Sequence, residues 1–472
     1  MEPPVAAVVR LAAVSRALVL ALSLLARLLF RPYDTSASLH PPCLSSPSFP
    51  SPAPSHNSTA AAAAISSLAV WDGVHFARSA ECGYEYEQSF AFLPLLPASM
   101  ALLSRTLFAP LVPVLGYRAV LVISGHVLNN VAFVAAAAYF YRLSVLILKD
   151  SGAAYRAAVL FCFNPASVFY SSLYSESLYA LFSLGGLFYL FSGANTVAMI
   201  MLAVSGSARS NGALNAGYFC FQALLQAYDA AIQKKRPILA VQALITGFLR
   251  STFIFIPFFA FQAYGYLNIC LHGNSDELRP WCKVKLPLLY SFIQSHYWGV
   301  GFLRYFQVKQ LPNFLLASPI IATVEGRSVE LCESSDVATV LKSEFSSGLN
   351  NKKQAQTDVK KRKSAASEAT LASLDGNRST GRILKVDKDE CSVLVLPFIL
   401  HLTFMTFTAF FVMHVQVSTR FLSASPPIYW AASRILVSPR GSSKRWGYFI
   451  VVYFIAYILL GSLLFPNFYP FT

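Results

Sequence analysis

The residues best suited to do chemistry are a few carboxylates and arginines in apolar or aromatic surroundings. Asp72 directly follows Trp71, in an aromatic and acidic segment that precedes a long apolar run. A carboxylate at a membrane surface can act as a general base and take the proton of a hydroxyl as that hydroxyl attacks the anomeric carbon of a sugar. The aromatic neighbours would stack on sugar faces or sit at the membrane interface. The structural alternative makes Asp72 a helix N-cap and Trp71 an interface anchor.

Glu176, Arg209 and Arg420 form a second set, because each carries a charge within or next to an apolar run. Ionised groups are costly inside a bilayer and are often functional there. Glu176 is either an acid at a helix N-terminus, where the helix dipole favours it, or a residue that orients substrate. A guanidinium binds phosphate through two parallel hydrogen bonds, so both arginines are candidate phosphate ligands. The alternative is that they pair with Glu176.

Motifs of several other enzyme classes are missing from the sequence. It has no Walker, GxGxxG, HExxH or GxSxG element, and no DxD-type pair near Asp72 that would hold a metal and a nucleotide sugar. This favours a lipid-phosphate donor over a nucleotide-sugar donor. The 8 cysteines are scattered without a CxxC pair, so we expect no metal site, and no cofactor is indicated. Cys43 with Cys82, or Cys270 with Cys282, can pair if these segments are lumenal.

The composition places these residues in a membrane protein. Only 12% of the 472 residues are charged and 55% are hydrophobic, whereas soluble domains contain roughly 25% charged residues. Apolar runs of about 20 residues, the length that crosses a bilayer as a helix, recur along the chain. We therefore expect an all-α polytopic membrane protein with roughly ten spans, segments 196–219 and 287–306 among them.

The formal net charge of +15 has a topological explanation. Lys and Arg accumulate in cytosolic loops and at the ends of spans, and Lys234, Lys235 and Arg236 mark one such loop. Because no soluble basic face is visible, nucleic acid is not an expected partner.

Five regions are expected along the chain. They are a cytosolic N-terminus with the first span (1–30), a lumenal loop that carries Trp71 and Asp72 (31–89), a multi-span core (90–324), a polar insert (325–390) and the C-terminal spans (391–472). The loop contains a sequon at Asn57, which would be glycosylated in the lumen. The insert has a basic run and few aromatic residues, so we expect it to be disordered and cytosolic, with its sequon at Asn377 unused.

Ordered blocks over most of the chain resemble the GPI mannosyltransferase 2 family. The first is the segment WDGVHF (71–76), AECGYEYE (80–87) and FAFLPLLP (90–97). The others are FNPASVF (163–169), YSESLY (174–179), RSNG (209–212), YWGVGFL (297–303) with QLPNF (310–314), and HVQV (414–417) with TRF (419–421). Because the blocks keep their order over such a length, the match is more specific than a single motif.

The resemblance implies a GT-C-type, multi-span mannosyltransferase of the endoplasmic-reticulum membrane, with a large first lumenal loop and a lumenal active site. Its donor would be dolichol-phosphate-mannose. Its acceptor would be the GPI lipid intermediate that already bears one mannose, and the second mannose would be added in α1,6 linkage. The reaction would be a single inverting displacement, and a small membrane partner subunit is compatible with it.

The resemblance also bears on the site residues. It places the Trp-Asp element in the first lumenal loop and makes Asp72 the catalytic base, in agreement with the chemical argument. The contact of Arg209 and Arg420 with the donor phosphate is our own inference. The full set of expected substrate-binding residues is Trp71, His75, Glu81, Glu176, Arg209, Asn211, His414, Gln416 and Arg420.

The chain departs from the family in one region. The family continues the QLPNF block into a full span, whereas the apolar run here ends near Val324 and the polar insert follows. That insert is either a cytosolic insertion or a replacement for a span. Competing functions are a dolichol-phosphate-sugar transferase that acts on protein or on the N-glycan precursor, a multi-span lipid or solute transporter, and an inactive chaperone-like subunit.

Overall fold

The computed structural model describes residues 5–33, 43–44, 60–271, 279–285, 287–328, 394–438 and 441–471. These residues form α-helices joined by short 3₁₀ and π turns, without a strand, so the chain is an all-α polytopic membrane protein as expected. The sequons at Asn57 and Asn377, and the insert from residue 329 onward, lie outside the described residues.

Four helices in the described part are long and apolar enough to cross a bilayer. They are α1 (Val5–Leu29), α6 (Tyr117–Leu148), α12 (Pro237–Tyr266) and α19 (Gly441–Leu464). A fifth candidate is the pair α4 (Leu95–Arg105) and Ala109–Leu115, which includes α5 (Val112–Leu115) and is bent by 69°. The shorter apolar helices are α9 (Glu176–Phe191), α10 (Asn195–Ala208) and α16 (Leu396–Phe411). The remaining α-helices are α2 (Ala60–Ser66), α3 (Asp72–Cys82), α7 (Ser151–Cys162), α8 (Ser167–Ser171), α11 (Ala216–Tyr228), α13 (Leu289–Tyr297), α14 (Leu311–Ser328), α17 (Ser418–Phe421) and α18 (Pro426–Val437).

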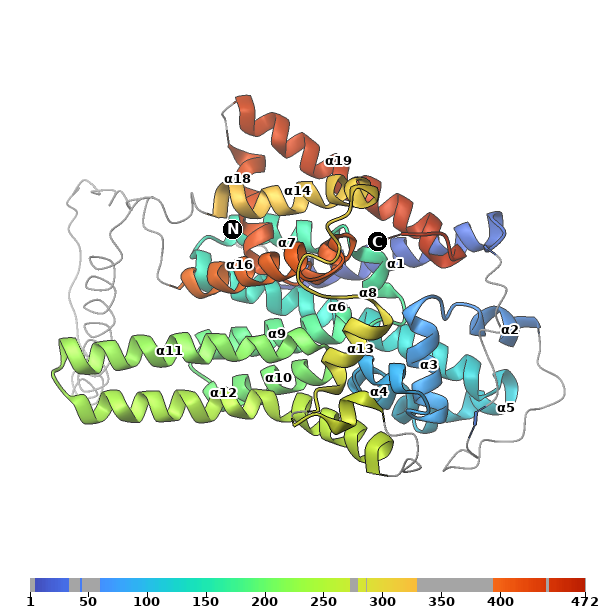
Figure 1. Cartoon of the computed structure of the whole chain (residues 1–472). Helices are drawn as coiled ribbons and strands as arrows, with labels where there is room; N and C mark the ends of the chain where they lie inside the picture. Colours follow the sequence, from blue (N-terminus) through green and yellow to red (C-terminus); the bar gives the residue numbers. More distant parts are fainter. Residues whose placement is uncertain are drawn as a thin grey trace, which may run out of the picture.

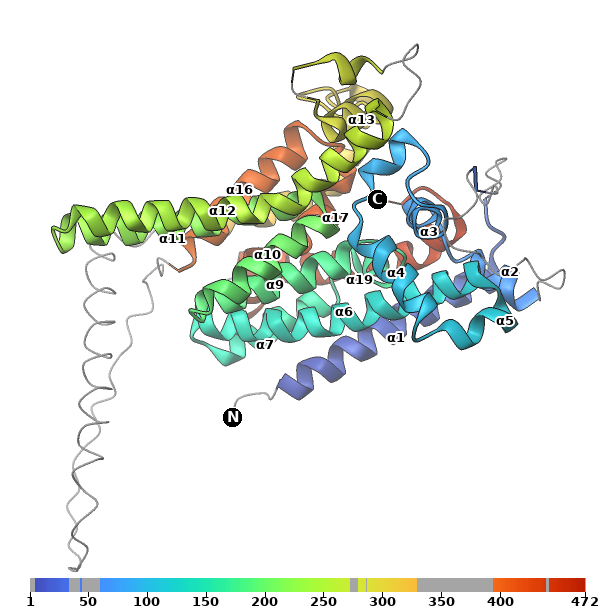
Figure 2. The same ribbon diagram turned by 90° about the horizontal axis from the view of Figure 1, so that it is seen from below.

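Different elements lie at the two ends of the bundle (Figures 1 and 2). At one end, right in Figure 1, the short helices α2, α3 and α5 gather beside the end of α1. At the other end α11 and α12 project as a hairpin. The tip of that hairpin carries Lys234, Lys235 and Arg236. Basic residues therefore mark the end of the bundle opposite to α3.

The core lies where α6, α7 and α18 meet. Phe161 of α7 stacks on Phe133 and Phe140 of α6, with ring centroids 5.2 and 4.7 Å apart. Tyr429 of α18 meets the Phe161 ring edge-on at 5.5 Å. All four rings are buried, and aromatic pairs in these geometries add about 0.5–1.5 kcal/mol each to the energy of burial.

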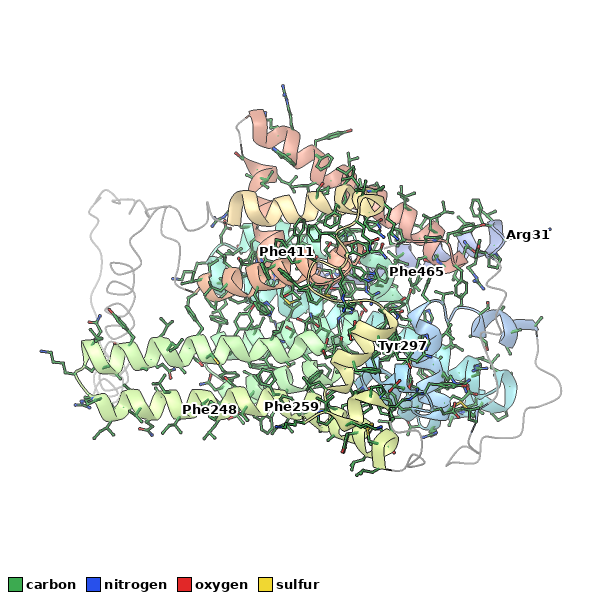
Figure 3. The ribbon with its side chains drawn as sticks, in the orientation of Figure 1. Arg31, Phe248, Phe259, Tyr297, Phe411 and Phe465 are labelled. Atoms are coloured by element: carbon green, nitrogen blue, oxygen red, sulfur yellow. A yellow bond between two sulfur atoms is a disulfide. The ribbon has the colours of Figure 1, made fainter. Side chains whose placement is uncertain are left out.

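The outer face of α12 is apolar and uncovered by protein. Phe248 and Phe259 lie on it and are 69% and 55% exposed (Figure 3). In a bilayer, hydrocarbon chains would cover such a face, which agrees with the low charge content of the chain.

Several segments that we expected to be continuous spans are interrupted, 196–219 and 287–306 most clearly. The segment 196–219 divides into α10, a 3₁₀ turn (Ser210–Asn215) and α11. The chain doubles back there because Gly212 has no side chain: a Cβ at this position would lie 2.4 Å from the backbone of Ser205. The segment 287–306 holds only the nine-residue helix α13. In contrast, α14 continues past Val324 to Ser328.

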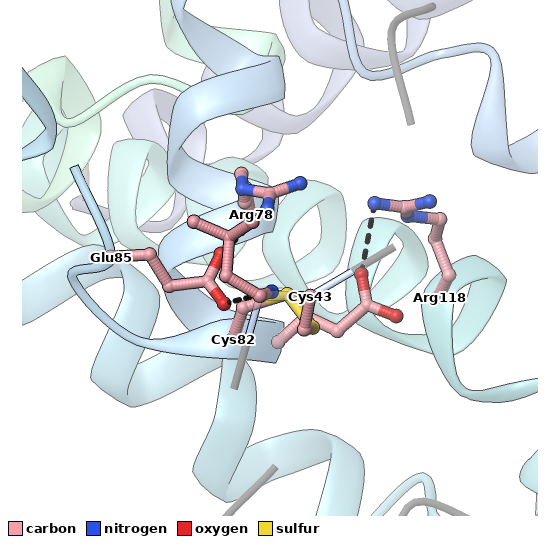
Figure 4. Close-up of a disulfide and its surroundings, with 7 residues drawn as sticks. Cys43, Arg78, Cys82, Glu85 and Arg118 are labelled. Carbon is pink, nitrogen blue, oxygen red and sulfur yellow. Dashed lines mark hydrogen bonds and ion pairs between the residues drawn. A yellow bond between two sulfur atoms is a disulfide. The ribbon is translucent and has the colours of Figure 1, made fainter. Parts of the chain in front are cut away.

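Two disulfides form within the described part of the chain, and both match pairs allowed by the sequence. Cys43 is joined to Cys82 at the end of α3, with their Cα atoms 5.5 Å apart (Figure 4). Next to this bond, Arg78 pairs with Glu85 at 2.6 Å. Cys270 is joined to Cys282 after α12, with their Cα atoms 5.8 Å apart. Disulfides persist in oxidising compartments such as the lumen of the endoplasmic reticulum.

A buried arginine in α1 holds the break between α7 and α8. The guanidinium of Arg16 donates to the carbonyl oxygens of Cys162 and Ser167, at 3.1 and 2.8 Å. It also lies over the ring of Phe133, 3.9 Å from the centroid. Arg16 is 2% exposed, and it supplies a donor to the carbonyl of Cys162, which ends α7 and has no partner within that helix.

We expect Arg16→Leu to lower the free energy of unfolding by about 3 kcal/mol, because two buried carbonyls would each lose a hydrogen bond from the guanidinium. Unfolding by SDS in mixed micelles measures this change. Arg10→Leu is the matched control, since Arg10 is exposed on the same helix. Equal stability of the two variants would contradict the role given to Arg16.

Candidate active site

Four charged residues from distant parts of the chain meet beside the start of α3. Arg420 Nε donates to Glu176 Oε1 at 2.8 Å, and both Nη atoms of Arg420 donate to Asp72 Oδ2 at 3.3 Å. Arg209 Nη1 donates to the same oxygen of Glu176. Two arginines thus balance two carboxylates, as charges in an apolar bundle require. We call these residues the charge cluster.

Each member of the charge cluster stands at a helix end or in a very short helix. Asp72 and Glu176 are the first residues of α3 and α9. Arg209 follows the last residue of α10 with extended backbone, and Arg420 lies in the four-residue helix α17. In membrane proteins, interrupted helices are tolerated where the irregular backbone is buried in protein or lines a cavity. The breaks therefore coincide with the place where polar chemistry is possible.

The structure decides between the alternatives left open for these residues. The N-cap of α3 is Trp71 and makes no side-chain cap, so the idea that Asp72 caps this helix is wrong. Glu176 does sit at a helix N-terminus, and both arginines pair with it. Glu176 is only 2% exposed, whereas Asp72 is 38% exposed. Asp72 is therefore the carboxylate of the cluster that a substrate can reach.

Two aromatic residues support Arg420. Its guanidinium carbon lies 4.8 and 5.0 Å from the ring centroids of Tyr174 and Phe169. The Tyr174 hydroxyl accepts a hydrogen bond from the backbone N–H of Asp72 at 3.1 Å. Burial, together with the charge of Asp72, raises the pKa of Tyr174 well above its ordinary value. The Tyr174 hydroxyl is therefore neutral at physiological pH.

The charge state of Arg420 follows from its partners. Burial alone would lower the pKa of Arg420, but the charges of Glu176 and Asp72 raise that pKa above its ordinary value. Arg420 thus keeps its positive charge while it holds one oxygen of Asp72. The other Asp72 oxygen has no partner in the charge cluster and is available to a substrate.

The residue before Asp72 has a strained backbone. Trp71 has φ 52° and ψ −128°, in a region that costs a residue other than glycine about 1–3 kcal/mol. Its indole N–H donates to the carbonyl of Phe465 at 3.2 Å, and its ring lies 5.8 Å from that of Phe468. The C-terminal segment after α19 therefore holds the Trp-Asp element in its position (Phe465 is labelled in Figure 3).

A first cavity, of about 350 Å³, opens on one side of the charge cluster. We call it the α13 cavity, because Tyr290 and Gln294 of α13 line it. Its wall combines polar and aromatic side chains. The lining residues are Asp72, Phe76, Ala91, Phe92, Leu93, Ser175, Ala208, Arg209, Ser210, Tyr290, Gln294, Trp298, Val300, Met413, His414, Gln416, Val417 and Arg420.

A second cavity, of about 550 Å³, lies between α14 and α19, and we call it the α14–α19 cavity. Most of its wall is apolar. The lining residues are Trp71, Asp72, Phe169, Tyr174, Asn313, Leu316, Gln416, Val417, Arg420, Tyr457, Leu460, Leu464, Phe465, Pro470 and Phe471.

Most of the predicted site residues face these cavities. Beyond the charge cluster, Trp71 lines the α14–α19 cavity, His414 lines the α13 cavity, and Gln416 lines both. His414 Nε2 is hydrogen-bonded to the Trp298 carbonyl at 2.8 Å, and its ring stacks on Tyr305 at 4.6 Å. Trp71, just before α3, and His414 and Gln416, in the segment before α17, thus come together only when the chain folds.

Besides Glu176, which is buried within the charge cluster, three predicted site residues do not line either cavity. His75 stacks on Phe92, with ring centroids 4.7 Å apart. Glu81 pairs with Arg118 of α6 at 2.9 Å, near the far end of α3. Asn211 is buried within the 3₁₀ turn after α10. His75 and Glu81 thus have protein contacts, whereas the buried amide nitrogen of Asn211 has no hydrogen-bond partner among the described residues. Substrate contacts of all three stay predictions.

Sequence reasoning also missed residues that shape the site. Tyr174 and Phe169 hold Arg420, and Asn313 lines the α14–α19 cavity and donates to the Tyr305 hydroxyl at 2.8 Å. That hydroxyl in turn donates to Gln416 Oε1 at 2.9 Å. The signal was present, because Phe169, Tyr174 and Asn313 lie in blocks that resemble the family, but attention to charged residues passed over them.

Within the described residues, one group has the spacing of metal ligands. Cys43, Cys82 and Glu85 offer atoms within 4.8 Å of one another. The two sulfur atoms are bonded to each other, so they are not the thiolates that bind metals. This group lies at the far end of α3 from Asp72 and is better suited to anchoring the loop.

Comparisons with known proteins agree with the resemblance noted in the sequence. The model of a family described as Mannosyltransferase (PIG-V) matches residues 5–472. GPI alpha-1,6-mannosyltransferase 2 of Homo sapiens is 30% identical, over 86% of this chain and 88% of its own length. GPI mannosyltransferase 2 of Drosophila melanogaster is 28% identical over the same shares. No solved structure is significantly similar to the chain.

We expect Glu176→Ala to lower the free energy of unfolding by about 3–5 kcal/mol, because it leaves Arg209 and Arg420 without their buried partner. Glu81→Ala removes a partly exposed ion pair and should cost no more than about 1 kcal/mol. SDS titration of both purified variants measures the difference. Equal losses would show that Glu176 is not what holds the cluster together.

Proposed function

Because the chain belongs to the mannosyltransferase (PIG-V) family, we propose that it adds the second mannose of the GPI anchor. The donor is dolichol-phosphate-mannose, the acceptor is the GPI precursor that carries one mannose, and the new linkage is α1,6. The activity that the relatives' names state supports a GPI acceptor over a protein or an N-glycan precursor.

One observation carries the chemical part of the proposal. Asp72 is an accessible carboxylate whose Oδ2 is held by Arg420, and it lines two adjoining cavities. A transfer between two substrates needs a base that both can approach.

The proposed reaction is a single displacement. The acceptor hydroxyl attacks the anomeric carbon of the donor mannose, and its proton passes to Asp72. The new bond joins the acceptor oxygen to that carbon, while the bond between the carbon and the phosphate oxygen breaks. Its electron pair leaves with dolichol phosphate. Attack from the side opposite to the leaving group inverts the configuration at the anomeric carbon.

Arg420 contributes electrostatically to the same step. As the phosphate leaves, negative charge grows on its oxygens, and a fixed guanidinium stabilises that charge without reorganisation. When Asp72 accepts the proton, its negative charge is lost and the cluster becomes net positive. The positive charge of the cluster thus increases at the same time as the negative charge on the leaving phosphate. Every part of this mechanism uses side chains of the chain itself, and no cofactor enters it.

We also propose that the site faces the lumen. The disulfide of Cys43 and Cys82 lies in the loop that carries Asp72, and that of Cys270 and Cys282 lies in the segment before α13. Both bonds favour the oxidising lumen of the endoplasmic reticulum. The basic tip of the α11–α12 hairpin, at the opposite end of the bundle, favours the cytosol there.

We expect Asp72→Asn to reduce mannose transfer by at least about 100-fold, because Asn cannot accept the proton of the acceptor hydroxyl. The measurement is complementation of cells that lack the second GPI mannosyltransferase, scored by surface GPI-anchored proteins and by the one-mannose lipid intermediate.

Asp150→Asn is the matched control for this experiment. Asp150 caps α7 by accepting from two backbone N–H groups, and asparagine is an equally good cap. Full rescue by a well-expressed Asp72→Asn variant would remove Asp72 from catalysis. Failure of the wild-type chain to process the one-mannose intermediate would count against the acceptor.

We expect Asn57 to carry an N-linked glycan and Asn377 to remain unmodified, since the first loop is proposed to be lumenal and the insert cytosolic. Treatment with an endoglycosidase, followed by gel electrophoresis, detects the glycan. Asn57→Gln should abolish the mobility shift, and Asn377→Gln should leave it unchanged. The reverse pattern would invert the topology.

A further inference from the structure

The two cavities beside Asp72 differ in lining, and this difference assigns the two substrates. We propose that the α14–α19 cavity binds the polyprenyl-phosphate donor and that the α13 cavity binds the glycan of the acceptor. The proposal rests on the function proposed above and specifies which part of the site each substrate occupies.

The cavities share part of their walls. Asp72, Gln416, Val417 and Arg420 line both of them. Two substrates react only when their reacting atoms approach to about 3–3.5 Å, so the shared wall is where the anomeric carbon and the acceptor hydroxyl must meet. An inverting displacement also requires the hydroxyl and the leaving phosphate to lie on opposite sides of that carbon. Entry of the substrates from two separate cavities meets this requirement.

The α14–α19 cavity suits a hydrocarbon chain with a phosphate at one end. Leu316 of α14 faces Leu460 and Leu464 of α19 across an apolar wall. Burial of an isoprenoid chain against it is favourable, at roughly 25 cal/mol per Å². Leu316 and Leu460 are 50% and 47% exposed. Their neighbours Leu315 and Leu459, which do not line the cavity, are 64% and 52% exposed on the same helices. The cavity therefore borders the surface that meets the bilayer, where the rest of a long polyprenyl chain can stay.

The polar side chains of this cavity are gathered around the charge cluster. Arg420 is the only cation among its described lining residues, and Asn313 and Gln416 stand beside it. Two tyrosines of α19, Tyr453 and Tyr457, donate to the carbonyl of Leu316 at 3.1 and 3.3 Å. These bonds join α14 to α19 and keep the two walls in register. A phosphate held by Arg420 would thus have its lipid chain directed between the two helices.

The α13 cavity has a different character. Arg209, Ser210, Gln294 and His414 offer hydrogen-bonding groups, and Phe92, Tyr290 and Trp298 offer aromatic rings. Sugars need both, because their hydroxyls require hydrogen-bond partners and their C–H faces pack on aromatic rings. Tyr290 and Ser210 are already joined by a hydrogen bond of 2.8 Å between their hydroxyls, so part of this wall is organised before a ligand binds.

The test changes the lining of one cavity at a time by substitution. Leu316→Trp and Leu460→Trp place a large ring in the α14–α19 cavity, and Leu315→Trp and Leu459→Trp are the matched controls on the outer surface. We expect the first pair to raise the KM for dolichol-phosphate-mannose by about tenfold and to leave the KM for the acceptor within about twofold of wild type. The controls should leave both constants unchanged.

The reciprocal variant is Gln294→Ala in the α13 cavity, with Gln307→Ala on the exposed surface as its control. Gln294→Ala should raise the KM for the acceptor and leave the KM for the donor unchanged, and Gln307→Ala should change neither. If Leu316→Trp and Leu460→Trp raise the KM for the acceptor alone, the assignment is reversed and the proposal fails. If folded variants change neither constant, the α14–α19 cavity is not a substrate site.

A binding experiment separates this inference from the proposed function. Photoreactive dolichyl phosphate should label α14 or α19 in the wild-type chain, and unlabelled dolichyl phosphate should suppress the labelling. Labelling of α13 in place of these helices would overturn the inference. If the wild-type chain transfers no mannose to the GPI precursor but α14 and α19 are labelled, the acceptor is wrong and the donor cavity stands.

Discussion

The organisation of the site depends on the neutralisation of buried charge by Arg420. A carboxylate as buried as Glu176 is unstable in an apolar bundle unless cations accompany it, and Arg420 and Arg209 both reach the same oxygen. Arg420 uses its remaining donors on Asp72. One guanidinium therefore connects the buried carboxylate to the accessible one, and aromatic rings from α8 and the following loop hold it there.

The interrupted helices follow from this arrangement. A continuous span would keep Arg209 or Glu176 on a helix side facing lipid or packed apolar side chains, at high cost. Breaks at the starts of α3 and α9 and at the end of α10 bring the charged residues to a common point, where irregular backbone lines the cavities. Arg16 supplies hydrogen bonds to a comparable break, between α7 and α8, deeper in the bundle.

The chain brings its two ends to the same place. The first loop delivers Trp71 and Asp72, and the segment after α19 supplies Phe465, whose carbonyl holds the Trp71 ring. The positive φ of Trp71 is tolerated because the hydrogen bond to Phe465 and the packing on the ring of Phe468 hold the residue in this conformation. This one packing arrangement thus produces both the strained backbone next to Asp72 and a cavity wall built from the C-terminal segment.

The sequence by itself determined the class of the molecule and identified Asp72 as the candidate base. Low charge and long apolar runs predict a helical membrane protein because hydrophobicity is a local property that can be read along the chain. The Trp71–Asp72 pair and the isolated charges of Glu176, Arg209 and Arg420 were recognisable because charge is rare in such a chain. The two possible disulfides were also recognisable from the chain, but their formation was left open.

Only the tertiary structure decided which residues share the site and where helices break. Arg420 and Asp72 are 348 positions apart, and no local pattern reports a contact over that separation. The break at Arg209 depends on the close approach of Gly212 to Ser205. Hydropathy along the sequence carries no information about such a backbone contact. His75 and Glu81 share blocks with site residues, yet their side chains contact Phe92 and Arg118. A sequence block records proximity along the chain, whereas the direction of a side chain is set by the packing around it.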